Sequence, residues 1–155
     1  MTVATQTSTT QEALEAARAV GRSAGLAYAG GISPRQAWAL VEAGEAVLVD
    51  VRTNEERVFV GYVPESVHVP WATGTSLTRN PRFTRELEAK TGKDAVVLLL
   101  CRSGNRSALA AEAAAKAGFT QIFNVLEGFE GDLDEQQQRG RDGGWRSYDL
   151  PWIQQ

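Results

Sequence analysis

The sequence predicts an α/β protein with an open, mostly parallel sheet of four to five strands and helices on both faces. Two apolar runs, 46–50 and 95–100, have the length and composition of strands that are buried on both sides. Each run is followed by a segment with helical spacing. Strands and helices that alternate in this way are typical of a parallel sheet covered by helices.

Capping motifs and apolar spacing locate the other elements. Ser33-Pro34-Arg35-Gln36 and Thr53-Asn54-Glu55-Glu56 both fit a capping box, in which the first side chain and the fourth bond each other's backbone N–H groups. The predicted helices are 33–44, 53–60, 80–92 and 107–117, and the predicted short strands are 67–69 and 121–125.

The N-terminal segment, residues 1–28, is expected to be a flexible extension, and residues 29–155 are expected to form one domain. The Thr/Ser-rich start through Thr10 has no apolar periodicity, so disorder is predicted there. Gln11 to Val20 has the spacing of an amphipathic helix. A chain of 155 residues is close to the size at which one hydrophobic core is normal.

Charge and hydropathy exclude several classes of partner. The net charge is −3 and the charged residues of both signs are interspersed, which argues against nucleic acid and anionic membranes. No stretch approaches the roughly 18 apolar residues that a spanning helix needs. The first residues lack the basic and apolar regions of a signal peptide. We therefore expect a cytoplasmic protein.

The chain contains one cysteine, Cys101, and one histidine, His68. An intramolecular disulfide is therefore impossible, and a Cys/His zinc cluster would have too few ligands. We expect neither a metal nor a cofactor. Any chemistry at Cys101 has to proceed without a second cysteine in the same chain.

The segment from Cys101 to Ser107 joins the most apolar strand to an Ala-rich helix. Ligands of open parallel sheets bind beyond the carboxyl ends of the strands, where this loop lies. Gly104 allows the loop to curl with its N–H groups inward, and the next helix adds the positive end of its dipole. With Arg102 and Arg106 nearby, these features favour a thiolate and an anionic substrate. The alternative is a cysteine that simply packs in the core.

Three motifs extend this interpretation: Cys101-Arg102-Ser103-Gly104-Asn105-Arg106-Ser107, Val49-Asp50-Val51-Arg52 and Gly61-Tyr62-Val63-Pro64-Glu65-Ser66. They resemble, respectively, the active-site loop, the Asp-x-Arg strand end and the Gly-His-Ile-Pro-Gly-Ala turn of the rhodanese family. The resemblance covers about residues 30–152 and implies a rhodanese-like fold. Tyr62 and Phe129 depart from the family pattern, in which a His and a second Gly are common.

The resemblance implies a sulfurtransferase with a double-displacement cycle. Cys101 would attack the outer sulfur of a small anionic donor such as thiosulfate, or of a persulfide donor that can be a protein. The new persulfide would pass its sulfur to cyanide, a thiol or a protein acceptor. The implied substrate-binding residues are Arg102, Ser103, Gly104, Asn105, Arg106 and Ser107. Asp50 and Arg52 would support the site, or would form an ion pair that does not touch the substrate.

Two other functions remain open at this stage. Cysteine-dependent phosphatases and arsenate reductases of similar fold place five residues between Cys and Arg, whereas four separate Cys101 from Arg106 here. The shorter loop suits a sulfur atom better than a phosphoryl group. A sulfur carrier that docks a partner protein and turns over little free substrate is the second alternative. We also expect Arg102 to steer anionic donors, and the tail from Gly143 to Trp152 to pack on the domain.

Overall fold

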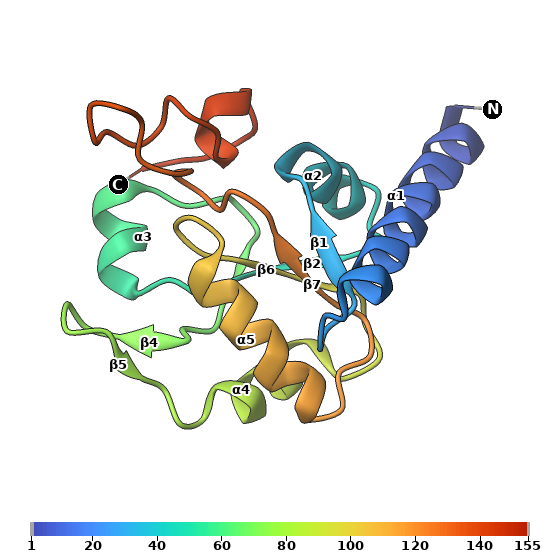
Figure 1. The fold of residues 1–155 in the computed structure, drawn as a ribbon, viewed down its shortest axis with the longest axis horizontal. Helices are drawn as coiled ribbons and strands as arrows, with labels where there is room; N and C mark the ends of the chain where they lie inside the picture. The colour runs from blue at the N-terminus through green and yellow to red at the C-terminus, as the bar shows by residue number, and fades with distance from the viewer. Residues whose placement is uncertain (1, 155) are drawn as a thin grey trace.

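Within residues 2–154, which the computed structural model describes (side chains from residue 9 onward), five parallel strands form one sheet (Figure 1). The strand order is β1 (Gly30–Ile32), β7 (Ile122–Val125), β6 (Val97–Leu100), β2 (Val47–Asp50) and β3 (Val67–His68). The predicted fold class is therefore confirmed. Strand β6 lies in the middle of the sheet and is paired on both sides with parallel neighbours.

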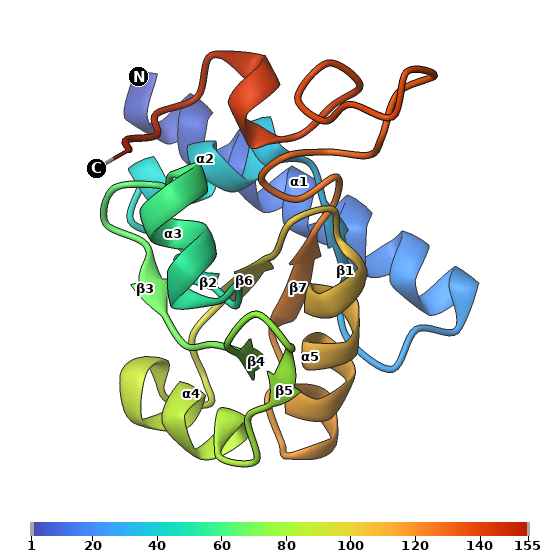
Figure 2. The same ribbon diagram turned by 90° about the vertical axis from the view of Figure 1, so that its left-hand side faces the viewer.

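Helices cover both faces of the sheet (Figure 2). They are α1 (Thr2–Ala24), α2 (Pro34–Glu42), α3 (Asn54–Val60), α4 (Phe83–Thr91) and α5 (Asn105–Lys116). Helices α2 and α3 begin with the two predicted capping boxes. Strand β1 and a hairpin of β4 (Ala72–Thr73) and β5 (Thr78–Arg79) were not predicted.

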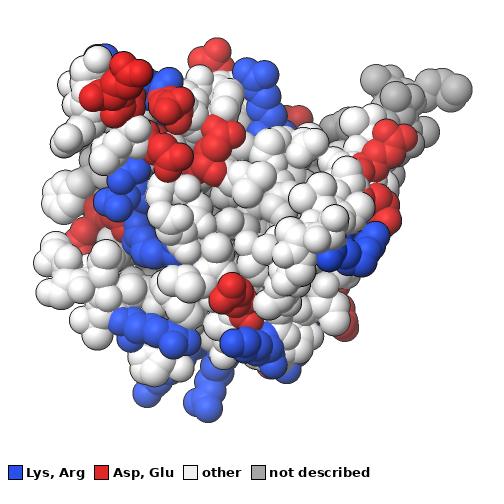
Figure 3. All heavy atoms as spheres, viewed as in Figure 1, with Lys and Arg blue, Asp and Glu red and all other residues white. Residues whose placement is uncertain are grey.

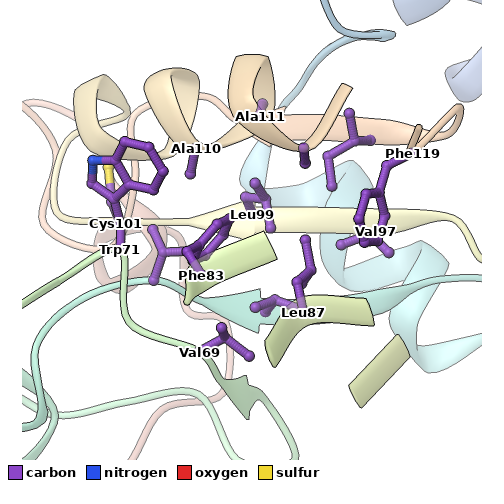
Figure 4. Close-up of a cluster of buried hydrophobic side chains, with 14 of the residues drawn as sticks. Val69, Trp71, Phe83, Leu87, Val97, Leu99, Cys101, Ala110, Ala111 and Phe119 are labelled. Atoms are coloured by element: carbon purple, nitrogen blue, oxygen red, sulfur yellow. The ribbon is translucent and has the colours of Figure 1, made fainter. Parts of the chain in front are cut away.

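The core of the described chain has two layers, because successive residues of a strand point to opposite faces. Val97, Leu99 and Cys101 face α4 and α5. Leu98 and Leu100 face α1, α2 and the C-terminal segment, which begins at residue 144. Figure 4 shows the first layer, with Cys101 beside Trp71 at one end. Cys101 is thus held at the end of a strand that is buried on both faces.

The N-terminal segment differs from the prediction. A single helix, α1 (Thr2–Ala24), is longer than the helix predicted from Gln11 to Val20, and it includes Thr9 and Thr10, which were predicted to be disordered. Thr10 and Leu14 are buried, and α1 packs along β1. Leu14 and Ala17 supply the apolar face. Gly21 allows the helix to approach the backbone of Ala29, because a Cβ at Gly21 would lie 2.3 Å from the Ala29 carbonyl oxygen. The division of the chain at residue 28 stays a prediction.

The C-terminal segment covers the α1–α2 side of the sheet, as Figures 1 and 2 show. Its short 3₁₀ helix η1 (Trp145–Tyr148) carries Trp145, which is completely buried and packs edge-on against Trp38. The Trp145 Nε1–H group donates to the Pro151 carbonyl at 2.9 Å. Among the helices described in residues 2–154, none has the length and apolar character needed to cross a membrane.

Candidate active site

Cys101 is the first residue after β6, and its side chain is only 1 % exposed. The chain turns at once into α5, whose N-cap is Gly104 with a φ of 104°. Because glycine adopts positive φ readily, its N–H can turn back toward the sulfur. The Gly104 N–H donates to Cys101 Sγ at 3.1 Å. The positive end of the 12-residue helix α5 therefore faces the sulfur atom.

Ser107, in the first turn of α5, places a second hydrogen-bonding group at the sulfur. Its Oγ lies 3.2 Å from Cys101 Sγ and 3.3 Å from the Gly104 carbonyl oxygen. Both donors to sulfur are buried, so water does not compete with them. Donors to the charged form of an acid favour that form, so the arrangement suits a sulfur anion.

A second loop supports the backbone of the Cys101 loop. The Phe129 N–H donates to the Cys101 carbonyl at 2.7 Å, and the Glu130 N–H donates to the Arg102 carbonyl at 2.9 Å. Gly128 makes this approach possible, since a Cβ there would lie 2.5 Å from Arg102 C and Ser103 N. Phe129, which departs from the family pattern expected from the sequence, is fully buried beneath the loop.

Asp50 and Arg52 form a fully buried ion pair at the end of β2. Arg52 Nε and Nη2 donate to the two oxygens of Asp50 at 3.0 and 2.8 Å, and Arg57 donates to Asp50 at 2.9 Å. The Arg52 guanidinium lies over the Phe129 ring, 4.2 Å from its centroid. The Asp50–Arg52 pair therefore packs against the loop that contains Phe129, and neither side chain reaches the surface.

The Arg106 side chain is paired with a carboxylate. Its guanidinium makes two hydrogen bonds to the carboxylate of Glu56 on α3, at 2.7 and 2.8 Å. Burial alone raises the pKa of Glu56. The hydrogen bonds from Arg106 and Thr53, with the charges of Arg106 and Arg52, outweigh this and lower the pKa to about 2. The hydrogen bond to Glu56 in turn raises the pKa of Arg106.

A cleft of about 390 Å³ opens beside the loop. Its walls come from the start of α3, the β4–β5 hairpin, the Cys101 loop and the loop after β7: Thr53, Glu55, Glu56, Val60, Gly74, Thr75, Leu77, Arg102, Arg106, Glu130 and Arg139. On this face of the molecule, Lys and Arg side chains gather beside α3, with carboxylates next to them toward the C-terminal segment (Figure 3). The cleft is therefore lined by charges of both signs, and Arg106 is already paired with Glu56.

The predicted site residues occupy different places around this cleft. Arg102 is exposed at the cleft, and its side chain has no hydrogen-bond or ion-pair partner among the described residues. Asn105 is also exposed, while Ser103 is half-buried. Gly104 and Ser107 lie at the sulfur. No group of three or more His, Cys, Asp or Glu side chains within the described residues is arranged to hold a metal ion.

Sequence reasoning missed two residues of this site. Glu56 was recognised only as part of a capping box, and nothing local showed that it would pair with a residue 50 positions away. Asn124 is 5 % exposed, and its amide bonds both Ser107 and Gly104. A signal was present for Asn124, because it is a polar residue within an otherwise apolar strand.

A family model, described as the rhodanese-like domain, matches residues 33–135. The match spans the Asp-x-Arg strand end, the Cys101 loop and the supporting loop at Phe129. The chain belongs to the rhodanese-like domain family. This membership confirms the resemblance expected from the three motifs.

Similar proteins include one named as a sulfurtransferase and one named as uncharacterised. The chain is 48 % identical to Rv0390 of M. tuberculosis, whose crystal structure superposes with a TM-score of 0.73 over 81 % of this chain and 98 % of that one. It is 35 % identical to an uncharacterised protein of Rickettsia prowazekii, over 73 % of this chain and 87 % of that protein. It is 34 % identical to the thiosulfate sulfurtransferase GlpE of Pseudomonas savastanoi, over 64 % of this chain and 82 % of that protein.

Proposed function

We propose that this rhodanese-like protein is a sulfurtransferase that carries sulfane sulfur as a persulfide on Cys101. The observation that supports this most directly is the environment of the sulfur. A buried Gly104 N–H and the Ser107 hydroxyl both reach Cys101 Sγ at the N-terminus of α5. The likeness to a protein named thiosulfate sulfurtransferase supports the same activity.

In the first half-reaction the Cys101 thiolate attacks the outer sulfur of thiosulfate. A new S–S bond forms on Cys101, the S–S bond of thiosulfate breaks, and sulfite leaves with the electron pair. In the second half-reaction the carbon of cyanide, or the sulfur of an acceptor thiolate, attacks the outer sulfur of the persulfide. Thiocyanate or a new persulfide leaves, and the Cys101 thiolate is regenerated.

The loop around Cys101 has to stabilise negative charge on sulfur before and after each step. The Gly104 N–H and the dipole of α5 do this at the inner sulfur without any movement during the reaction. Arg102 lines the cleft and is free to attract an anionic donor.

The orientation of Arg106 favours sulfur transfer over phosphate chemistry. A cysteine-dependent phosphatase needs an arginine that faces the phosphoryl oxygens. Both terminal nitrogens of the Arg106 guanidinium instead donate hydrogen bonds to the carboxylate of Glu56. Within the described residues, the groups that hydrogen-bond the sulfur atom are the Gly104 N–H and the Ser107 hydroxyl.

Intact-protein mass spectrometry tests this proposal. Wild type and Cys101→Ser are treated with thiosulfate, desalted and then exposed to cyanide. We expect wild type alone to gain one sulfur atom, and cyanide to remove it with release of thiocyanate. A persulfide that forms readily but turns over slowly would assign the carrier role instead. Wild type that gains no sulfur from thiosulfate or from an organic persulfide would refute the proposal.

A further inference from the structure

Asn124 is a buried polar residue in the middle layer of the molecule, far from the Cys101 loop in sequence. It lies on β7, in register with Leu99 of β6 and Gly31 of β1. A buried amide is costly unless its donors and its acceptor are satisfied. Its partners therefore indicate why an amide stands at this position.

Those partners are the two residues that bond the sulfur. Asn124 Nδ2 donates to the Gly104 carbonyl at 3.2 Å, and Asn124 Oδ1 accepts a hydrogen bond from Ser107 Oγ. Gly104 and Ser107 are also the residues whose N–H and O–H groups reach Cys101 Sγ, at 3.1 and 3.2 Å. The Asn124 side chain on strand β7 therefore bonds both residues that reach the sulfur.

We propose that Asn124 is a positioning residue that acts on Cys101 through Gly104 and Ser107. It fixes the turn that presents the Gly104 N–H to sulfur, and it controls where the Ser107 hydroxyl proton points. The inference rests on the proposed function only in taking Cys101 as the reacting sulfur.

The hydroxyl of Ser107 carries one proton but lies within reach of three acceptors. The amide orientation of Asn124 follows from its donation to Gly104, so its oxygen faces Ser107. While Cys101 is a neutral thiol, Ser107 donates to Asn124 and accepts from the thiol S–H. When the sulfur becomes a thiolate or a persulfide anion, the hydroxyl turns and donates to it, because hydrogen bonds to ions are stronger.

Tyr28 provides a matched control. It is half-buried, and its hydroxyl hydrogen-bonds the side chain of Asn124 without an interaction with the Cys101 loop. Burial raises the pKa of Tyr28, the Glu112 charge adds to this, and the hydrogen bond with Asn124 opposes it. Tyr28→Phe removes a bond to Asn124 but leaves both bonds from Asn124 to the loop.

The test is the rate of Cys101 alkylation by iodoacetamide as a function of pH, in wild type, Asn124→Leu, Asn124→Asp and Tyr28→Phe. Leucine has a similar size and makes no hydrogen bond. Aspartate keeps the oxygen toward Ser107 but cannot donate to Gly104, and it holds the Ser107 proton more tightly. Arg106 interacts electrostatically with Cys101, Asp50 and Glu56, and none of these groups changes in the variants.

We expect both Asn124 variants to alkylate about five- to thirtyfold more slowly than wild type at neutral pH, the effect of losing one or two buried hydrogen bonds. The pH at which alkylation reaches half its maximal rate should rise, whereas Tyr28→Phe should match wild type. A purely structural role would lower the melting temperature without moving this pH profile. Folded Asn124→Leu and Asn124→Asp proteins with the wild-type profile would overturn the proposal.

A double-mutant cycle with Ser107→Ala tests whether Asn124 acts through Ser107. If it does, Asn124→Leu slows alkylation less in the Ser107→Ala background than in wild type. If Asn124→Leu slows alkylation equally in both backgrounds, Asn124 does not act through Ser107. Alkylation requires no sulfur donor, so it is independent of the proposed activity. If wild type takes up no sulfur, only the proposed function is refuted. If alkylation is unaltered in the Asn124 variants, only the proposed role of Asn124 is refuted.

Discussion

Arg106 and Glu56 form an ion pair with two hydrogen bonds, at 2.7 and 2.8 Å, that ties the first turn of α5 to the first turn of α3. Glu56 is also the residue that completes the capping box of α3, where it accepts a hydrogen bond from the Thr53 N–H at 3.1 Å. The same carboxylate therefore serves a local helix cap and a contact 50 residues away. It positions the loop that carries Cys101 relative to one wall of the cleft.

Glu56→Gln should destabilise the protein in a pH-dependent way. At pH 7 we expect a loss of about 1.5–3 kcal/mol in the free energy of unfolding, the usual range for hydrogen bonds to charged groups. The Glu56 pKa is lowered from 4.5 to about 2, so its contribution is complete above about pH 4.5 and disappears as the pH falls through about 2.

Urea unfolding of wild type and Glu56→Gln between pH 7 and pH 2 measures this difference. The gap between the two proteins should be largest near neutrality and close toward pH 2. Glu55→Gln is the control, because Glu55 lies beside Glu56 on α3 and makes no ion pair within the described residues. A gap of constant size across the range would contradict the assigned pKa.

Asp50→Asn should be strongly destabilising. Asp50 is completely buried and pairs with Arg52 and Arg57, so the substitution leaves a buried guanidinium without its counter-charge. We expect a loss of about 3–5 kcal/mol by chemical denaturation. Glu88→Gln, which removes a half-exposed partner of Lys93, should cost less than about 1 kcal/mol. Comparable losses in the two variants would show that burial of the Asp50 pair does not matter.

Arg102→Ala should weaken the capture of anionic donors. Arg102 lines the cleft with an exposed, unpaired guanidinium, so its charge is available to attract thiosulfate. We expect KM for thiosulfate to rise several-fold, kcat to change little, and the dependence of kcat/KM on salt to become weaker. Arg82→Ala removes the same charge from an exposed residue that does not line the cleft. Steering by Arg102 is excluded if both variants show the same KM and salt dependence as wild type.

Much of the architecture was predictable from local patterns. The apolar runs gave β2 and β6, the capping boxes gave the starts of α2 and α3, and the loop at Cys101 was placed correctly at the end of a central strand. Helix α1 was predicted too short, because Thr- and Ser-rich sequence lacks a helical pattern and its packing against β1 is a tertiary effect.

The position of Cys101 and its loop was predictable from the sequence, but the side-chain contacts around them were not. Arg106 was expected to bind substrate, yet its side chain pairs with Glu56, which nothing in the spacing of either residue indicates. Asn124 could have been noticed as a polar residue in an apolar strand, but its partners depend on which loops meet at that edge of the sheet. Long-range side-chain pairs of this kind are set by the packed structure and not by local propensity.

Removal of the C-terminal segment, residues 144–155, should lower the melting temperature clearly. The segment contributes Trp145, which is fully buried. Its backbone N–H donates to the Gly128 carbonyl at 2.8 Å, next to the loop that supports the Cys101 backbone. Trp145→Ala alone should lower the free energy of unfolding by about 3–5 kcal/mol, because removal of a large buried ring leaves a cavity. Leu133→Ala, at a side chain that is 49 % exposed, should change stability little.

Calorimetry and cysteine alkylation together locate the effect of this segment. If the tail holds the Gly128–Phe129 loop against the Cys101 backbone, Trp145→Ala should lower the melting temperature and also alter the rate at which Cys101 is alkylated. The link runs through the bond from the Phe129 N–H to the Cys101 carbonyl at 2.7 Å. A truncated protein that melts at the wild-type temperature would mean that the segment adds no stability to the domain.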